Sequence, residues 1–363
     1  MRALVLSDFW KLTVDEVPDP EPRPDEVLIE VVATGICGSD LHGFTGENGR
    51  RRPGQVMGHE TVGRVLAVGA QVPAGTCAVG DAVTVNPVLW CGRCRQCRAG
   101  REQACPDKQV IGVTPELVSA FAERMAVPAQ NVVRLPDGMP VEHGALVEPL
   151  AVGYHALVRG DCGSGDTVLV LGGGPIGQAC ALAALRMGAE RVVVSEPAPA
   201  RRDLNARLGV AVVDPTTEQD LPAAVATALD GESPTLVVDA VGSAATLATA
   251  FACAPLGATV VLVGMGAPAV ELAAYEISTK ERSVVGSFCY SAAEFRDTAA
   301  WAATVPESLA VLIEGRADLD GGPASFGALA RGEDPSSKIL IYPNGRAAAE
   351  ASSGRDPDPD PAT

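Results

Sequence analysis

The first half of the chain contains short apolar runs separated by polar turns, a pattern that is typical of β-strands. Residues 27–33 (VLIEVVA) and 63–68 (GRVLAV) are rich in β-branched residues. Residues 82–85 (AVTV) follow a Gly-Asp turn signal, and the proline-rich residues 16–26 are expected to form a loop. The pattern predicts a β-rich, partly barrel-like domain.

From about residue 153 the pattern changes to short apolar strands that alternate with helical stretches. The expected strands are 167–171, 191–195, 210–213, 235–240 and 258–263, with helices such as 175–187 and 200–208 between them. Such alternation predicts a parallel sheet covered by helices on both faces. It fades after about residue 288, and the segment up to about residue 343 is expected to return to the first domain.

These patterns predict two domains and a tail. We expect one domain from residues 1–152 and 289–343, and a second from residues 153–288. A length of 363 residues suits two domains better than one core. Residues 344–363 consist mainly of Ala, Ser, Asp and Pro, cannot bury much apolar area, and are predicted to be disordered.

Composition and charge narrow the classes of partner and location. The net charge of −17 argues against nucleic acid or an anionic membrane surface as a partner. The N-terminal sequence MRALVLSDFWKL lacks the pattern of a signal peptide, because its apolar run is short and Asp8 interrupts it. No apolar stretch is long enough to span a membrane without interruption. We therefore expect a cytoplasmic protein.

Four cysteines lie within fifteen residues with the spacing C-x2-C-x2-C-x7-C. Four thiolates at this spacing can close a tetrahedral shell around one zinc ion and leave no open position, so the predicted site is structural. A disulfide pair and an iron–sulfur cluster are the alternatives, and Pro106 after the last cysteine is also found in bacterial ferredoxin motifs. The lobe is expected at about residues 90–106, with the ligands Cys91, Cys94, Cys97 and Cys105.

A glycine-rich motif follows the first strand of the second domain and predicts a dinucleotide site. The three glycines allow a tight turn, close approach of a pyrophosphate, and close packing of helix on strand. Proline suits the first turn of the helix, whose N-terminus offers free N–H groups to phosphates. The expected cofactor-binding residues are Gly172, Gly174, Pro175, Ile176 and Gly177.

The choice of cofactor depends on Glu196, which ends the next strand 19 residues after Gly177. A carboxylate there accepts hydrogen bonds from the ribose 2′-hydroxyl and repels a 2′-phosphate, which favours NAD over NADP. Arg201 and Arg202 follow closely; they could hold a phosphate, or they form a solvated helix face beside the adenine.

A second set of zinc-type donors lies in the first domain. Cys37 and His42 occur in CGSDLH, and His59 occurs in GHETVG. A thiolate and an imidazole suit zinc, and a carboxylate could complete three ligands with one position open for substrate or water. Isolated residues of these types are more often structural, so the chemistry alone leaves both interpretations open.

The order of the motifs adds a family resemblance. CGSDLH, GHETVG, the four-cysteine lobe, VEPLAVGYHA (147–156) and GGGPIG occur in the order of the zinc-dependent medium-chain dehydrogenases/reductases. The chain resembles the branch that contains sorbitol, butanediol and threonine dehydrogenases, over nearly all of residues 1–343. The resemblance implies an α/β protein with a GroES-like catalytic domain and a doubly wound Rossmann domain.

The resemblance also implies residue roles. Cys37 and His59 match catalytic zinc ligands, whereas Glu60 and Glu148 match acids that bind zinc directly or through water. Ser39 and His42 match a proton relay, and Asp40 matches an acid that orients His59. Arg201 is assigned to the cofactor site. His143 and His155 match no functional position; His143 is expected at the surface or a helix start, and His155 in packing near the domain junction.

The resulting expectation is a reversible NAD-linked oxidation of a secondary alcohol to a ketone, with a polyol, diol or sugar-like substrate. Two zinc ions per chain, one catalytic and one structural, and a homodimer or homotetramer are implied by the resemblance. The alternatives are an enzyme like L-threonine 3-dehydrogenase and a non-catalytic nucleotide-binding relative. A zinc-free quinone or enoyl reductase is disfavoured, because it would leave Cys37, His59 and the lobe without a purpose.

Overall fold

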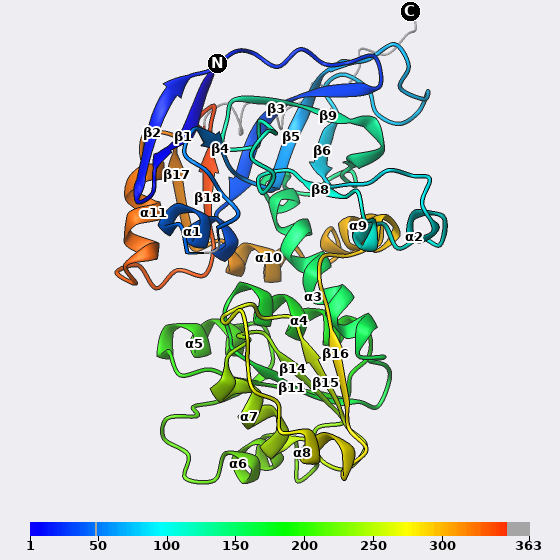
Figure 1. Ribbon diagram of the computed structural model, residues 1–363, viewed down its shortest axis with the longest axis vertical. Coiled ribbons are helices and arrows are strands. Elements are labelled where there is room, and N and C mark those ends of the chain that lie inside the picture. Colours follow the sequence, from blue (N-terminus) through cyan, green and yellow to red (C-terminus); the bar gives the residue numbers. More distant parts are fainter. Residues whose placement is uncertain (48, 347–363) are drawn as a thin grey trace, which may run out of the picture.

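The computed structural model describes residues 1–47 and 49–346, and the chain forms a mixed α/β protein in two parts stacked along its long axis (Figure 1). The β-rich part contains both ends of the described chain, and the part built on a parallel sheet contains its middle. Most of the predicted disordered tail, residues 347–363, lies outside the described residues. Asn344 hydrogen-bonds through Nδ2 to the carbonyl oxygens of Val31 and Glu123, both at 3.0 Å.

The β-rich part is organised around a mainly antiparallel sheet with the strand order β10-β6-β5-β3-β18-β17. Its long central strands pair antiparallel and bury apolar side chains on both faces. The predicted strands at 27–33, 63–68 and 82–85 are confirmed within β3, β5 and β6. The bounds are β3 Glu26–Gly35, β5 Glu60–Val68, β6 Ala82–Val85, β10 Val132–Arg134, β17 Gly315–Asp318 and β18 Ile339–Tyr342; β9 (Arg124–Pro128) also pairs with β3.

A smaller sheet and the end of the chain complete this part. The smaller sheet has the order β2-β1-β4, with β1 Arg2–Asp8, β2 Lys11–Glu16 and β4 Gln55–Val56. At the other end of the chain, β18 pairs antiparallel with β3, and α11 (Gly322–Ala330) packs near α1 (Gly38–Thr45). Residues more than 270 positions apart therefore meet where the candidate site begins.

The second part is a six-stranded parallel sheet with the order β13-β12-β11-β14-β15-β16, and it is Rossmann-like, as expected. Alternate residues of β11 (Thr167–Leu171) belong to two different buried apolar clusters. Val168 and Val170 belong to one cluster, and Leu169 and Leu171 belong to the other. Helices therefore cover both faces. The other bounds are β12 Arg191–Ser195, β13 Ala211–Val213, β14 Leu236–Asp239, β15 Thr259–Leu262, β16 Ser283–Gly286, α4 Pro175–Arg186, α5 Pro199–Arg207, α6 Leu221–Ala228 and α7 Ala244–Cys253.

The edge strand β16 was not predicted. Its four residues SVVG are exposed or half-buried, so they lack the run of buried apolar residues that marks the inner strands. Pairing with β15 in parallel register makes it a strand. The strand is recognisable only from its neighbour, because its own pattern is short and weak.

The two parts share one apolar core at their junction. Helix α3 (Val147–Arg159) packs on α4, and α9 (Ala292–Ala302) and α10 (Pro306–Leu312) lie beside it between the two sheets (Figure 1). Leu150 of α3, Leu182 of α4, Phe295 of α9 and Tyr342 of β18 belong to the same buried cluster. Within the described residues, no helix is long and apolar enough to cross a membrane.

Candidate functional site

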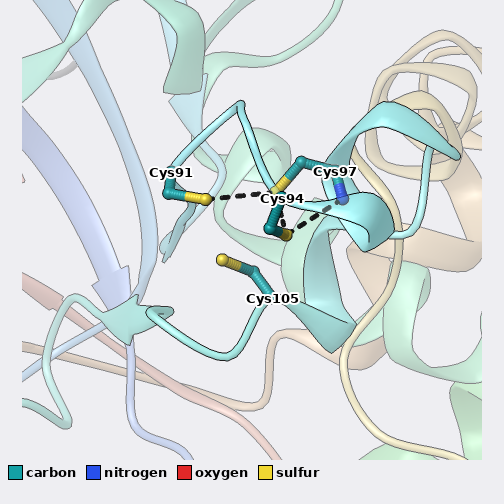
Figure 2. Close-up of side chains that lie close together, drawn as sticks. All are labelled: Cys91, Cys94, Cys97 and Cys105. Atoms are coloured by element: carbon teal, nitrogen blue, oxygen red, sulfur yellow. Dashed lines mark hydrogen bonds between the residues drawn. The ribbon is translucent and has the colours of Figure 1, made fainter.

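The four-cysteine lobe brings its sulfurs together around one point. The lobe is a loop that carries α2 (Arg95–Arg98) and a short 3-10 helix (Glu102–Ala104) between β7 (Val88–Leu89) and β8 (Gln109–Val110). All four sulfurs lie within 4.8 Å of one another (Figure 2). Sulfurs in a tetrahedron with 2.3 Å bonds to one ion stand about 3.8 Å apart. The Sγ separations of 3.5 Å from Cys94 to Cys97 and 4.0 Å from Cys91 to Cys97 fit that geometry.

Local contacts shift the pKa values of two lobe thiols in opposite directions. Backbone N–H groups of Arg93 and Cys94 lower the pKa of the Cys91 thiol to about 7, whereas burial and neighbouring sulfurs raise that of Cys97 to about 12. All ten cysteines are described, and each is free in the structure. The set of four converging sulfurs is compatible with a structural zinc ion.

A second group of metal-type donors forms where β3 meets α1. Cys37 precedes the first turn of α1, while His59 and Glu60 lie at the start of the neighbouring strand β5. One donor atom from each residue lies within 4.8 Å of the other two. His59 and Glu60 are buried and Cys37 is half-buried. The group therefore fits a zinc ion held by a thiolate, an imidazole and a carboxylate.

Asp40 lies beside His59, within ion-pair distance of its ring. Asp40 is fully buried, and its Oδ1 lies 3.5 Å from Nδ1 of His59. Burial alone would raise the pKa of Asp40 and lower that of His59, but each charge favours the other: the pKa of Asp40 is lowered and that of His59 is raised. A carboxylate on one ring nitrogen leaves the other nitrogen for a metal.

Arg51 forms a buried ion pair with Asp40, and nothing in the sequence indicates this pair. Its Nη2 donates to Asp40 Oδ1 at 3.3 Å, and its side chain is 1 % exposed. A buried arginine is recognisable only once its partner is placed beside it, because its sequence neighbours are polar and lie in a loop.

Glu60 forms a buried ion pair with a lysine far away in sequence. Lys338 Nζ donates to Oε1 and Oε2 of Glu60 at 2.7 and 2.5 Å, and to the carbonyl oxygen of Ile36 at 3.2 Å. Burial alone would lower the pKa of Lys338, but the Glu60 carboxylate raises it. Both carboxylate oxygens of Glu60 therefore face a cation that the sequence analysis did not identify.

Glu148 lies close to this group but outside its three members. It sits in the first turn of α3, is 7 % exposed, and accepts a hydrogen bond from the hydroxyl of Tyr290 at 2.8 Å. Burial raises the pKa of Glu148 to about 7; nearby His59 opposes this shift and Glu60 adds to it. Tyr290 is a further residue that sequence reasoning missed, because it comes from the segment that links β16 to α9.

Ser39 and the other three histidines differ in burial and in their hydrogen-bond partners. Ser39 is half-buried at the start of α1, and His42, one turn later, is exposed with Nδ1 3.1 Å from Glu47 Oε2. His143 is buried, so the prediction of a surface position is wrong, although it does lie near the start of a 3-10 helix (Val141–Leu146). His155 is buried in α3 with Nδ1 3.0 Å from both carboxylate oxygens of Glu294.

The glycine motif joins β11 to α4 with the geometry of a phosphate cradle. Gly172 has φ of 95°, a left-handed conformation that favours glycine. A β-carbon at Gly177 would collide with the carbonyl oxygen of Gly172. Pro175 begins α4, and half-buried Ile176 packs against the sheet core in the same turn. The helix N-terminus and the bare backbone fit a dinucleotide pyrophosphate.

Glu196 lies beside this cradle, and the two following arginines differ. Glu196 is buried and accepts from the backbone N–H of Gly173 at 2.7 Å and of Ala198 at 2.8 Å. Arg202 is held by an ion pair with Asp214 at 2.8 Å and by two backbone carbonyl groups. A β-carbon at Gly174 would lie 3.8 Å from Arg201 Nη1, so Arg201 borders the cradle.

Comparison with known proteins matches both parts of the chain. Residues 23–137 match the alcohol dehydrogenase GroES-like domain, and residues 175–304 match the zinc-binding dehydrogenase domain. Over 361 residues the chain is 31% identical to sorbitol dehydrogenase of Bacillus subtilis, covering 95% of this chain and 98% of that protein. It is 40% identical over 219 residues to L-threonine 3-dehydrogenase of Pyrococcus abyssi, covering 60% and 62%.

A solved structure shows the same fold. A zinc-binding dehydrogenase from Sinorhizobium meliloti, described as bound to NADP, superposes with a TM-score of 0.84 at 32% identity, covering 94% of this chain and 99% of that chain. The likeness therefore extends over both parts of the molecule and not over the nucleotide-binding fold alone.

Proposed function

The chain belongs to the zinc-dependent alcohol dehydrogenase family, and from this premise we propose that it oxidises a secondary alcohol of a polyol, diol or sugar-like substrate to a ketone. The observation that carries the proposal is the convergence of Cys37, His59 and Glu60, with buried Glu148 next to them. The full-length likeness to a sorbitol dehydrogenase supports a polyol over threonine, which is the substrate named for a relative matched over 60% of the chain.

The proposed zinc ligands are Cys37 and His59, with Glu60 or Glu148 as the carboxylate. Bound zinc supplies Lewis acidity that lowers the pKa of a substrate hydroxyl. Asp40 and Arg51 keep the His59 ring in one orientation. Lys338 donates to both carboxylate oxygens of Glu60, and Tyr290 donates to Glu148. The second zinc ion is proposed for the four-cysteine lobe.

The proposed proton path runs along the start of α1. Ser39 is half-buried beside Cys37, and His42 is exposed one turn further on. A proton leaving the alcohol would pass from Ser39 toward His42 and solvent, through the cofactor ribose. The exposure of His42 suits the outer end of such a path, because its ring contacts solvent.

We propose NAD as the hydride acceptor. Glu196 is a buried carboxylate beside the glycine cradle, and a carboxylate repels the extra 2′-phosphate of NADP. Arg202 is already engaged by Asp214, which removes one of the two cations that could attract that phosphate. Arg201 borders the cradle and is proposed to contact the cofactor's adenosine end.

A specific observation favours a second candidate substrate class, one that carries a carboxylate. Burial raises the pKa of Cys289 to about 12; Glu148 adds to the shift, while Lys108, His59 and Arg50 oppose it. Lys108 Nζ lies 5.5 Å from the ring centre of Phe288, which precedes Cys289 in the sequence. Cations at this point would suit threonine or a sugar acid.

The proposed domain division follows the chain's two sheets. Residues 1–152 and 289–343 would form the catalytic domain, because β18 returns to pair with β3. Residues 153–288 would form the nucleotide-binding domain. The open edge strand β16 would pair with a second copy in a homodimer or homotetramer. Light scattering on the purified protein measures the assembly.

The test is NADH formation by zinc-loaded protein with polyols, vicinal diols, cyclitols, sugars, aldonates and L-threonine. We expect turnover of a neutral polyol or diol class that is lost in Cys37→Ser and kept in Cys77→Ser, a matched change outside both cysteine groups. Turnover of threonine or aldonates alone would refute the neutral-polyol assignment. Absence of turnover for every compound, with NAD still bound, would favour a non-catalytic nucleotide binder.

A further inference from the structure

The peptide of Gly173, in the middle of the glycine cradle, is held by three buried side chains. Its N–H donates to Glu196 Oε2 at 2.7 Å. Its carbonyl oxygen accepts from Gln178 Nε2 at 2.8 Å and from Asn205 Nδ2 at 2.9 Å. Gln178 and Asn205 are 1 % and 0 % exposed. A cofactor that competes for Glu196 or presses on this loop must therefore disturb a fully hydrogen-bonded peptide.

Gln178 also hydrogen-bonds to a residue of the β-rich part of the molecule. The same Nε2 donates at 3.0 Å to Oγ of Ser337, which lies just before β18 in the β-rich part. Gln178, Pro175 and Lys338 also line one small cavity at the junction. Asn205 differs, because the hydrogen bonds of its Nδ2 go to Gly173 and Arg201, both in the parallel-sheet part.

Ser337 is directly followed by the lysine that holds Glu60. The backbone here is fixed: Ser337 N donates to Glu314 Oε2 at 2.6 Å, and the Lys338 carbonyl accepts from Glu314 N at 3.0 Å. Ser337 and Lys338 are therefore both hydrogen-bonded to Glu314 through their backbone groups. Lys338 in turn contacts both oxygens of Glu60 at 2.7 and 2.5 Å.

We propose that Gln178 and Ser337 are positioning residues that link occupation of the dinucleotide site to the placement of Glu60 at the candidate metal group. The path runs from Gly173 through Gln178 and Ser337 to the Lys338–Glu60 pair. This inference rests on the proposed function, since it requires zinc at Cys37, His59 and Glu60 and a nucleotide at the glycine cradle. Its consequence is a reciprocal coupling, in which each ligand changes the affinity of the other by the same factor.

The test measures zinc affinity by equilibrium competition with a coloured chelator, with and without saturating NAD, in the full-length protein. Cys37→Ser identifies which zinc ion belongs to the candidate catalytic group. In the wild type we expect NAD to change the zinc affinity of that group about fivefold or more, the lower range of coupling between sites. In Gln178→Leu and in Ser337→Ala the ratio should fall toward one. Asn205→Leu is the matched control, because it removes a hydrogen bond to Gly173 that does not cross between the parts.

The Asn205→Leu control distinguishes a general destabilisation of the glycine cradle from loss of the Gln178–Ser337 contact between the two parts. Asn205→Leu should weaken NAD binding yet keep the ratio at saturating NAD. The inference is overturned if the wild type shows no NAD effect, if both link variants keep it, or if Asn205→Leu loses it equally. If Gln178→Leu fails to fold, judged by its thermal melt, Ser337→Ala decides the matter because it removes a single hydroxyl. Zinc content and NAD titration of the wild type show separately whether the proposed function has failed.

Discussion

Replacing Lys338 with methionine removes the cation that neutralises Glu60 while keeping most of the side-chain stem. The two side chains are 3% and 1% exposed, so water cannot take the place of the ammonium group. Unit charges about 3 Å apart attract by about 5–6 kcal/mol at an effective dielectric constant of 20, before the cost of desolvation is subtracted. Breaking a buried pair by removing one partner costs about 3–5 kcal/mol, because the other charge stays buried.

We therefore expect the Lys338→Met protein to lose about 3–5 kcal/mol of unfolding free energy in the metal-free state. For a domain of this size, the loss corresponds to a melting temperature lower by about 6–20 °C. The assay is urea unfolding of the chelator-treated protein, followed by circular dichroism. The matched control is Lys280→Met, the same change in a half-exposed pair with Glu276, for which the expected loss is about 0.5 kcal/mol or less.

Added zinc sharpens the test. If Glu60 lies beside a bound zinc ion, that ion replaces the missing positive charge, so zinc should stabilise Lys338→Met more than the wild type. The reasoning is refuted if the metal-free Lys338→Met protein is as stable as Lys280→Met. It is also refuted if zinc stabilises the variant and the wild type equally, because Glu60 would then lie outside the field of the ion.

Three further predictions concern the metal groups and pH. In Cys37→Ser, metal analysis should find one zinc ion per chain in place of two, with loss of NADH formation; two ions would contradict the ligand assignment. In Cys97→Ser, the lobe should lose its ion and become open to limited proteolysis, while the Cys37 group keeps its metal; a protected lobe would argue against a structural ion. Burial would raise the pKa of Glu142, but Arg316 and a tyrosine hydroxyl lower it below its usual 4.5. The ionised Glu142 carboxylate therefore contributes its full stabilisation above about pH 4.5, and this contribution is lost as the pH falls through the lowered pKa of Glu142. The difference in unfolding free energy between the wild type and Glu142→Gln should therefore shrink below that pH. A difference that stays constant with pH would contradict this.

The local chemistry of this protein was largely predictable from sequence. The four cysteines were recognisable as a metal-type group from their spacing, and the fold of the loop brings their sulfurs within 4.8 Å of one another. The glycine motif needed only a strand before it and a helix after it, and both are present as β11 and α4. Most parallel strands were recognisable because each is a run of buried apolar residues, and the edge strand β16 was missed because it is not.

The partners of the site residues were decided by tertiary structure alone. Sequence placed Glu60 beside His59, but not Lys338 beside Glu60, because 278 residues separate that pair. It likewise gave no sign of Tyr290 on Glu148, or of Gln178 on Ser337. The physical reason is that spacing and periodicity report contacts within one turn, loop or strand. A buried charge pair forms only where β18 returns to β3 and where the two parts of the molecule meet, and no local pattern encodes that meeting.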